Sequence, residues 1–219
     1  MDDRCVICYD SGTGGRYLYG KIKRAFPLEK TLYFSDLGNM PYGNKTKSGL
    51  KEILDRNMRK FLSYSPKAVV IACNTISTVF PDYRTEGGVR IFRVFPEIPK
   101  GKKTLLLSTE ATAGSFYVKR LIGHGDDVTL CPLAYLAEDI EKGKIDLSRD
   151  WEKIEREGKS GFECVSLGCT HYRAAIGRLK RIFPAAEIVD GADRTFSEVS
   201  SFLKNNPCGR EGSFIASRR

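Results

Sequence analysis

Two stretches of the sequence place a cysteine at the end of a short apolar run, followed by small polar residues. Cys73 ends the run in residues 67–75 (KAVVIACNT), and Cys169 ends the run in residues 162–171 (FECVSLGCTH). Runs of this length that are rich in Val, Ile and Leu are typical of buried parallel strands. Since the loops after such strands build the binding site of an open α/β sheet, we expect both thiols at the mouth of one site.

Two facing thiols suit the inversion of a carbon stereocentre. One thiolate takes a proton from the carbon while the other thiol returns a proton to the opposite face, so no organic cofactor is needed. The ordinary thiol pKa of about 8.5 lets both protonation states exist near neutral pH. A single cysteine in an apolar strand is more often a small core residue, so the hypothesis depends on the matched surroundings of the pair.

Other polar residues at strand ends are candidates for binding a carboxylate and stabilising developing negative charge. These candidates are Ser11, Asn74, Thr75, Thr112 and Thr170. Asp10 and His171 are candidates to accept a proton from a neighbouring thiol or to tune its charge. Two of these residues also have a structural explanation, because Asp10 and Thr112 could each cap a helix.

A glycine-rich turn at residues 10–15 and the acidic Asp36 admit a weaker alternative, a dinucleotide site. The third glycine of that fingerprint is missing, and the sequence has no Walker A pattern. Cys5 and Cys8 form a Cys-x-x-Cys pair, but residues three apart in a strand point to opposite faces, and no second pair completes a zinc site. We therefore expect neither an organic cofactor nor a metal.

Charge and cysteine content narrow the class of protein. The chain has 219 residues, seven cysteines and a net charge of +9. It has no apolar run near the roughly 18 residues of a membrane helix and no signal-peptide pattern at its start, so we expect a cytoplasmic protein with reduced thiols and no membrane partner. The basic charge is spread along segments such as 45–60 and 173–181, which favours solvated helix faces over a nucleic-acid surface.

Strand and helix patterns alternate along the chain, which predicts an α/β fold with mainly parallel sheets. Besides the two cysteine strands, we expect strands at 4–9, 31–35, 90–95, 104–108, 128–131, 187–189 and 213–216. We expect helices at 15–26, 45–60, 134–143, 148–158, 172–183 and 194–204, one more ending near 122, and an irregular or briefly helical segment at 76–89. Pro96 and Pro99 mark a domain crossing. The predicted first domain comprises 1–94 plus 194–219, and the second comprises 95–193.

The order of these motifs resembles that of the glutamate racemases, in the cofactor-independent aspartate/glutamate racemase superfamily. The resemblance covers nearly the whole chain, and its two cysteine motifs together are highly specific. The matching residues are Asp10-Ser11-Gly12 with Gly14-Gly15, Tyr33-Phe34-Ser35-Asp36, Pro41-Tyr42-Gly43, Ala72-Cys73-Asn74-Thr75, Thr109, Thr112, Ser115, Leu167-Gly168-Cys169-Thr170-His171-Tyr172, Phe183-Pro184 and Glu187-Ile188-Val189-Asp190.

The resemblance implies two α/β domains related by a pseudo-two-fold axis, with the site in the cleft between them. It implies that Cys73 acts on D-glutamate and Cys169 on L-glutamate, assisted by Asp10 and His171. The implied substrate-lining residues are Asp10, Ser11, Tyr42, Gly43, Asn74, Thr75, Thr170 and His171. The product would supply bacterial peptidoglycan synthesis, and a homodimer is among the assemblies of the family.

The chain also departs from the family pattern. It is shorter, chiefly between the cysteine motifs and at its end, and Arg173 replaces the usual Pro. In the family an acidic residue after a Cys-Pro segment helps to position the His; here Glu138, Asp139 and Glu141 are equal candidates. Pro41-Tyr42-Gly43 favours glutamate as substrate. An aspartate racemase, another amino-acid racemase of the superfamily and a non-catalytic amino-acid-binding relative remain alternatives.

Overall fold

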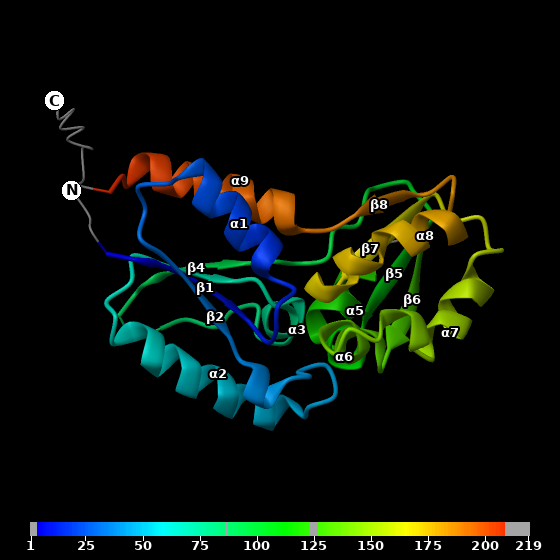
Figure 1. Cartoon of the computed structure of the whole chain (residues 1–219), viewed down its shortest axis with the longest axis horizontal. Helices are drawn as coiled ribbons and strands as arrows, with labels where there is room; N and C mark the ends of the chain where they lie inside the picture. The colour runs from blue at the N-terminus through cyan, green and yellow to red at the C-terminus, as the bar shows by residue number, and fades with distance from the viewer. Residues whose placement is uncertain (1–3, 86, 123–126, 209–219) are drawn as a thin grey trace, which may run out of the picture.

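The computed structural model describes residues 4–85, 87–122 and 127–208, which form two α/β halves (Figure 1). Each half contains a parallel sheet of four strands. The first sheet has the order β2-β1-β3-β4, with β1 (Val6–Asp10), β2 (Thr31–Ser35), β3 (Ala68–Ile71) and β4 (Arg90–Arg93). The second has the order β6-β5-β7-β8, with β5 (Thr104–Thr109), β6 (Val128–Leu133), β7 (Cys164–Gly168) and β8 (Glu187–Val189). The two sheets repeat one strand order, which confirms the predicted pair of similar parallel α/β units.

Helices cover both faces of the first sheet (Figure 1). On one face α1 (Arg16–Ala25) packs beside α9 (Ala192–Asn205), and on the other lies α2 (Lys47–Leu62); a short helix α3 (Asn74–Val79) follows β3. Cys5 packs in the α2 cluster and Cys8 in the α1–α9 cluster. The two thiols thus lie on opposite faces, as strand alternation predicts.

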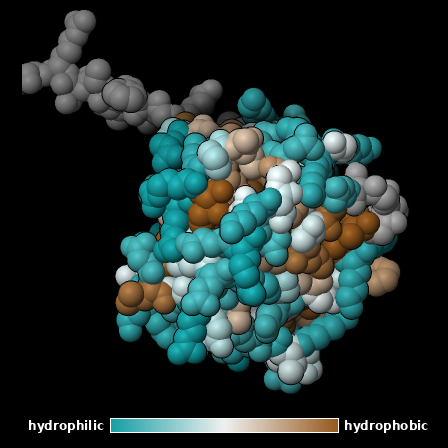
Figure 2. Space-filling view, turned by 90° about the vertical axis from the view of Figure 1, so that its right-hand side faces the viewer, coloured by the Kyte–Doolittle hydropathy of each residue, from teal (hydrophilic) through white to brown (hydrophobic). Residues whose placement is uncertain are grey.

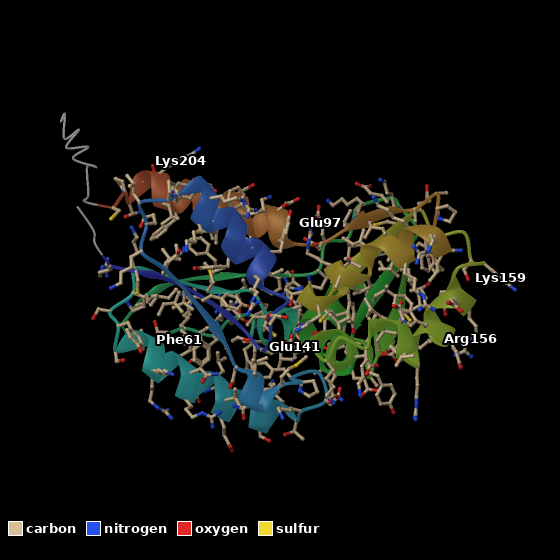
Figure 3. The ribbon with its side chains drawn as sticks, in the orientation of Figure 1. Phe61, Glu97, Glu141, Arg156, Lys159 and Lys204 are labelled. Carbon is tan, nitrogen blue, oxygen red and sulfur yellow. The ribbon has the colours of Figure 1, made fainter. Side chains whose placement is uncertain are left out.

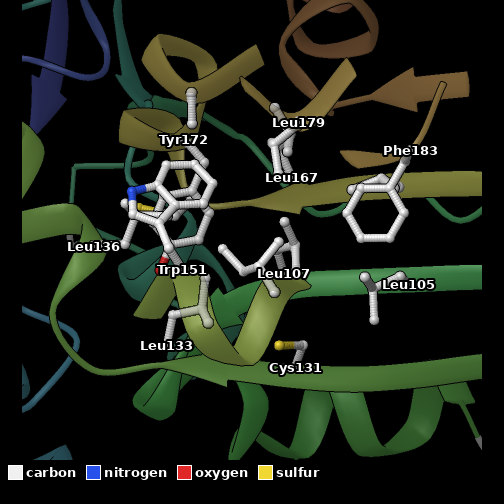
Figure 4. Packing of buried hydrophobic residues seen from close by; sticks show 14 of the residues in the cluster. Leu105, Leu107, Cys131, Leu133, Leu136, Trp151, Leu167, Tyr172, Leu179 and Phe183 are labelled. Atoms are coloured by element: carbon white, nitrogen blue, oxygen red, sulfur yellow. The ribbon is translucent and has the colours of Figure 1, made fainter. Parts of the chain in front are cut away.

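The second half has a core of apolar side chains that extends from Trp151 and Leu136 at one end to Leu105 and Phe183 at the other (Figure 4). The helices of this half are α4 (Glu110–Ala113), α5 (Phe116–Ile122), α6 (Leu136–Glu141), α7 (Asp150–Glu157) and α8 (Ile176–Ile182). Trp151 comes from α7, and its indole N–H donates to the carbonyl of Ile145, at 2.5 Å. Leu107 of β5, Leu167 of β7 and Leu179 of α8 complete this core, which holds the second cysteine strand rigidly in place.

Several predicted elements need correction at their ends. Strand β6 continues through Pro132, beyond the expected 128–131, because it is an edge strand where the missing proline N–H costs no ladder hydrogen bond. The helix expected at 172–183 is a 3-10 helix at Thr170–Ala175 followed by α8. The segment 76–89 begins within α3, and the expected strand at 213–216 lies outside the described residues.

The chain crosses between the halves twice, after β4 and again before α9. The two crossings touch, since a Cβ on Gly191 would lie 1.8 Å from the carbonyl oxygen of Phe95. The division into 1–94 plus 194–219 and 95–193 stays a prediction, placed at these crossings.

Hydrophilic residues cover most of the face formed by the second half, with apolar residues in separate patches (Figure 2). Across residues 4–85, 87–122 and 127–208, no helix combines the length and apolarity that a membrane span requires.

Candidate active site

Cys73 and Cys169 line one small pocket between the halves. Cys73 follows β3 and Cys169 follows β7, which hold equivalent places in their sheets. Of the predicted site residues, Ser11, Tyr42, Gly43, Asn74, Thr75, Thr170 and His171 also line this pocket. The cavity measures about 10 Å³, the room of about one water molecule. An amino acid does not fit in a cavity of this size, so the site must widen before one can bind.

The Cys73 thiol is buried against the first half of the chain. Its Sγ donates a weak hydrogen bond to Ser11 Oγ, at 3.8 Å. Burial raises the pKa of Cys73 to about 12, and the negative charge of Asp10 acts in the same direction. A thiolate formed here is consequently a strong base.

The Cys169 thiol faces an imidazole. Its Sγ lies 3.8 Å from His171 Nδ1, and the opposite ring nitrogen, Nε2, lies 2.7 Å from Glu141 Oε2. Burial raises the pKa of Cys169 above its usual range. The pKa of Glu141 is lowered overall. Burial acts to raise it, but the hydrogen bonds that Glu141 accepts from Thr13 and His171 outweigh burial.

Glu141 is thus the acidic residue that contacts His171, which the sequence left open among three candidates. Glu138 instead forms an ion pair with Lys142 at the exposed side of α6. Glu138 and Glu141 are three residues apart in one helix, so their sequence positions alone do not separate them. The reach of Glu141 to His171 depends on how α6 packs against the 3-10 helix after Cys169.

Asp10 lies fully buried beside the pocket without lining it. Its Oδ2 accepts the backbone N–H of Gly15, at 2.7 Å, and the hydroxyl of Thr170, at 3.3 Å. Within the described part of the chain, Asp10 Oδ1 has no hydrogen-bond partner. Burial raises the pKa of Asp10, opposed by the charge of His171 and the Gly15 N–H. The carboxylate therefore both supports the start of α1 and keeps one acceptor oxygen available.

Three threonine hydroxyls join the halves behind Cys73. Thr75 Oγ1 lies 3.0 Å from Thr109 Oγ1, and Thr112 Oγ1 lies within 3.4 Å of both. Thr112 is fully buried and does not line the pocket, whereas Thr109, absent from the predicted site, does. Thr109 caps α4, since its Oγ1 accepts the Thr112 N–H, and at the start of α5 it is Ser115 rather than Thr112 that accepts the N–H of Val118. The spacing of Thr109 and Thr112 could have signalled this cap.

Tyr42 lines the pocket, and its hydroxyl is held in the core. The hydroxyl donates to Asp36 Oδ2, at 2.5 Å, and lies 2.6 Å from the hydroxyl of Tyr9. Asn39 and Asn57 also donate to the Asp36 carboxylate, which leaves it engaged inside the first half rather than placed as a ribose ligand.

Gly43, next to Tyr42, fits because a Cβ would lie 2.6 Å from Thr109 Cβ. Its carbonyl accepts the N–H of Ala111, at 3.0 Å, a further bond between the halves.

Arg173, at the position where the resemblance leads us to expect Pro, also joins the halves. Its guanidinium carbon lies 3.4 Å from the centre of the Tyr17 ring, and it forms an ion pair with Asp190. Arg173 and Asp190 line a second small cavity, which Cys169 and Thr170 also line. The substitution thus adds contacts next to the second thiol.

Comparisons with known proteins agree with this geometry. No protein-family model matches the chain. The curated glutamate racemase of Thermus thermophilus is 30% identical over 217 residues, which cover 94% of this chain and 84% of that protein. The structure of the Francisella tularensis glutamate racemase in complex with D-glutamate matches with a TM-score of 0.79 at 21% identity, over 94% of this chain and 83% of that one. The structure of Escherichia coli glutamate racemase with L-glutamate and an activator matches with a TM-score of 0.76 at 24% identity, over 92% of this chain and 83% of that one. The two structures share the fold, and the Thermus relative shows that the chain belongs to the glutamate racemase family.

Proposed function

We propose that this chain is a glutamate racemase that interconverts L- and D-glutamate by proton transfer at Cα without an organic cofactor. The observation that carries the proposal is the pair of thiols, Cys73 and Cys169, which follow equivalent strands of the two halves and line one pocket. The family relationship supports it, and the fold neighbours with bound D- and L-glutamate support the choice of substrate.

In the proposed reaction the two thiols act from opposite faces of the substrate. With L-glutamate, the Cys169 thiolate takes the Cα proton and the Cys73 thiol donates a proton to the other face; with D-glutamate the roles reverse. Burial supports this chemistry, because it raises the thiol pKa values and so strengthens each thiolate as a base towards a weakly acidic carbon.

His171 is proposed to generate the Cys169 thiolate. An Nε2–H that donates to Glu141 leaves the Nδ1 lone pair facing Cys169 Sγ, so the ring can accept the thiol proton. The carboxylate of Glu141 then stabilises the imidazolium that forms. Asp10 is proposed for the corresponding task near Cys73, where its free Oδ1 is the available acceptor.

Backbone N–H groups at the start of α3, together with nearby hydroxyls, are proposed to hold the substrate α-carboxylate and to stabilise negative charge as the Cα proton leaves. The proposed substrate-binding residues are Asp10, Ser11, Tyr42, Gly43, Asn74, Thr75, Thr112, Thr170 and His171. Thr112 acts through Thr75, because it lies behind the pocket wall. A cytoplasmic location, a role in supplying D-glutamate for peptidoglycan and a homodimeric assembly belong to the same proposal.

The test is a racemisation assay with purified protein, without added cofactor, on glutamate and on aspartate. Loss of optical rotation from L-glutamate, faster than from L-aspartate, supports the proposal. Faster turnover of aspartate would replace the substrate and keep the two-thiol site. If neither amino acid racemises, the proposal is wrong, and a non-catalytic amino-acid-binding protein becomes the better account.

A further inference from the structure

The carboxylate that contacts His171 is also a contact between the two halves. Glu141 Oε2 accepts three hydrogen bonds: from His171 Nε2 at 2.7 Å, from the backbone N–H of Thr13 at 2.9 Å and from Thr13 Oγ1 at 2.9 Å. We propose that Thr13 is a positioning residue, which couples closure of the cleft to activation of Cys169 by fixing Glu141 against His171. This inference rests on the proposed racemase function.

Thr13 and Glu141 come from different halves of the molecule. Thr13 lies in the loop after β1, whereas Glu141 ends α6, at the junction between the halves (Figure 3). The neighbouring Gly12 shows how closely the loop approaches, since a Cβ there would lie 2.6 Å from both Glu141 Oε2 and His171 Nε2. The three hydrogen bonds to Glu141 therefore exist together only when the halves are closed.

Opening of the cleft removes two of these three donors. The pocket has room for about one water molecule, so an amino acid enters only after the halves separate. Separation parts Thr13 from Glu141 and leaves His171 as the remaining donor to Oε2. The Glu141–His171–Cys169 chain lies within the second half, and its carboxylate gains the two orienting donors of Thr13 only as the cleft closes, when substrate is sequestered from water.

Several charged or titratable groups surround Glu141. His171 faces it from the 3-10 helix after β7, and Tyr33 of β2 interacts with the charges of Asp10, Arg16 and Glu141 while its hydroxyl donates to Gly12 O, at 2.6 Å. On α6 itself, Glu138 is paired with Lys142, and Asp139 is the remaining acid. Among these groups, the backbone N–H and the hydroxyl of Thr13 are uncharged donors to Glu141. Both favour the ionised form of the Glu141 carboxyl, in agreement with its lowered pKa.

The variant Thr13→Val tests the coupling, because it removes the hydroxyl and keeps both the N–H and the side-chain shape. We expect kcat/KM for L-glutamate to fall about tenfold, the loss of one hydrogen bond to a charged group. We also expect the acidic limb of the pH profile to move to higher pH, since a carboxylate with fewer donors ionises at higher pH. Thr13→Ser restores the hydroxyl and should restore both quantities.

A matched control removes a different contact between the halves. Asn44 Nδ2 donates to the carbonyl of Ala134, at 3.4 Å, without touching Glu141 or His171. Asn44→Ala should leave the acidic limb where it is in the unmodified enzyme. If Asn44→Ala moved the limb as far as Thr13→Val, general loosening of the cleft would be the cause and the proposal would be wrong.

A double-mutant cycle decides whether Thr13 acts through Glu141. In the Glu141→Gln background, Thr13→Val should lower kcat/KM by less than twofold. A full tenfold loss in that background, or an unchanged pH profile for Thr13→Val alone, overturns this inference while leaving the racemase assignment intact. A complete absence of racemisation by the unmodified chain overturns both.

Discussion

His171 Nδ1 lies 3.8 Å from Cys169 Sγ, on the side of the imidazole ring opposite the contact with Glu141. Cys73 has a different neighbour, the hydroxyl of Ser11, also at 3.8 Å. The two thiols are therefore similar in position and different in surroundings. In the proposed reaction a histidine–carboxylate pair supports Cys169, and Asp10 supports Cys73.

Replacing either thiol should stop racemisation. In Cys73→Ser and Cys169→Ser the hydroxyl is a far weaker acid than the thiol it replaces, so each variant should lose at least about 10³-fold in kcat, measured by optical rotation. Cys208→Ser, at a half-buried position far along the chain, is the control that should keep full activity. Activity above a tenth of the unmodified value in either thiol variant would exclude that residue as a base.

The pH dependence of thiol alkylation follows from the buried site. Burial raises the pKa of Cys73 to about 12, so little thiolate exists at pH 7 and the fraction grows about tenfold per pH unit. Iodoacetamide labelling of Cys73, followed by mass spectrometry of its peptide, should rise steadily from pH 7 to pH 10. In urea the same peptide should level off near pH 8.5, the ordinary value. Levelling near pH 8.5 in the folded protein would contradict the buried environment.

Asp10 should be important for activity and unfavourable for stability. Burial raises the pKa of Asp10 in the folded state. Above that pKa the buried carboxylate lowers the free energy of unfolding, and this loss of stability disappears as the pH falls to the pKa of the unfolded state. Asp10→Asn removes the buried charge at nearly constant shape. We expect a melting temperature about 2–4 °C higher at pH 8, equivalent to about 1 kcal/mol, together with a large loss of activity.

The Asp10→Asn gain in melting temperature should shrink as the pH is lowered, because the unmodified carboxyl then becomes neutral too. A lower melting temperature for Asp10→Asn at pH 8 would mean that the ionised carboxylate stabilises the fold through its contacts with Gly15 and Thr170.

Gly12 should tolerate no side chain. A Cβ at this position would lie 2.6 Å from both Glu141 Oε2 and His171 Nε2, which is too close for any carbon contact. Gly12→Ala should therefore displace the imidazole and lower kcat by about 100-fold with the fold retained, as checked by activity and circular dichroism. The control is Gly177→Ala in α8, where nothing lies within 4 Å of the added Cβ and a gain of about 0.5–1 kcal/mol in stability is expected.

Much of the fold could be predicted from local patterns, because apolar strands and amphipathic helices alternate with clear Gly and Pro boundaries. Strands 31–35 and 187–189 match their predicted bounds. The ends of β6 and α8 were wrong for tertiary reasons: Pro132 is tolerated because its strand lies at a sheet edge, and residues after Cys169 form a tighter helix that places His171 beside the thiol.

Site residues could be predicted where a reactive residue type directly follows a predicted strand. They could be predicted less well where tertiary packing determines which side chains meet. The shared contexts of Cys73 and Cys169 predicted one common pocket, which both thiols line. The contacts of Thr13 and Thr109 depend on which surfaces of the two halves meet. The choice of Glu141 over Glu138 depends on how α6 packs against the 3-10 helix within the second half. No local pattern encodes either kind of packing. The roles proposed for these residues stay predictions until tested.

The most direct test of the two-thiol mechanism is isotope incorporation at Cα during the first few per cent of turnover in D2O. Starting from protiated L-glutamate, the D-glutamate formed should carry deuterium at Cα, because Cys73 delivers a solvent-derived proton, while the unreacted L-glutamate should remain largely protiated. D-glutamate that retains protium would mean that one base returns the same proton to both faces, and the proposed division of work between Cys73 and Cys169 would be wrong.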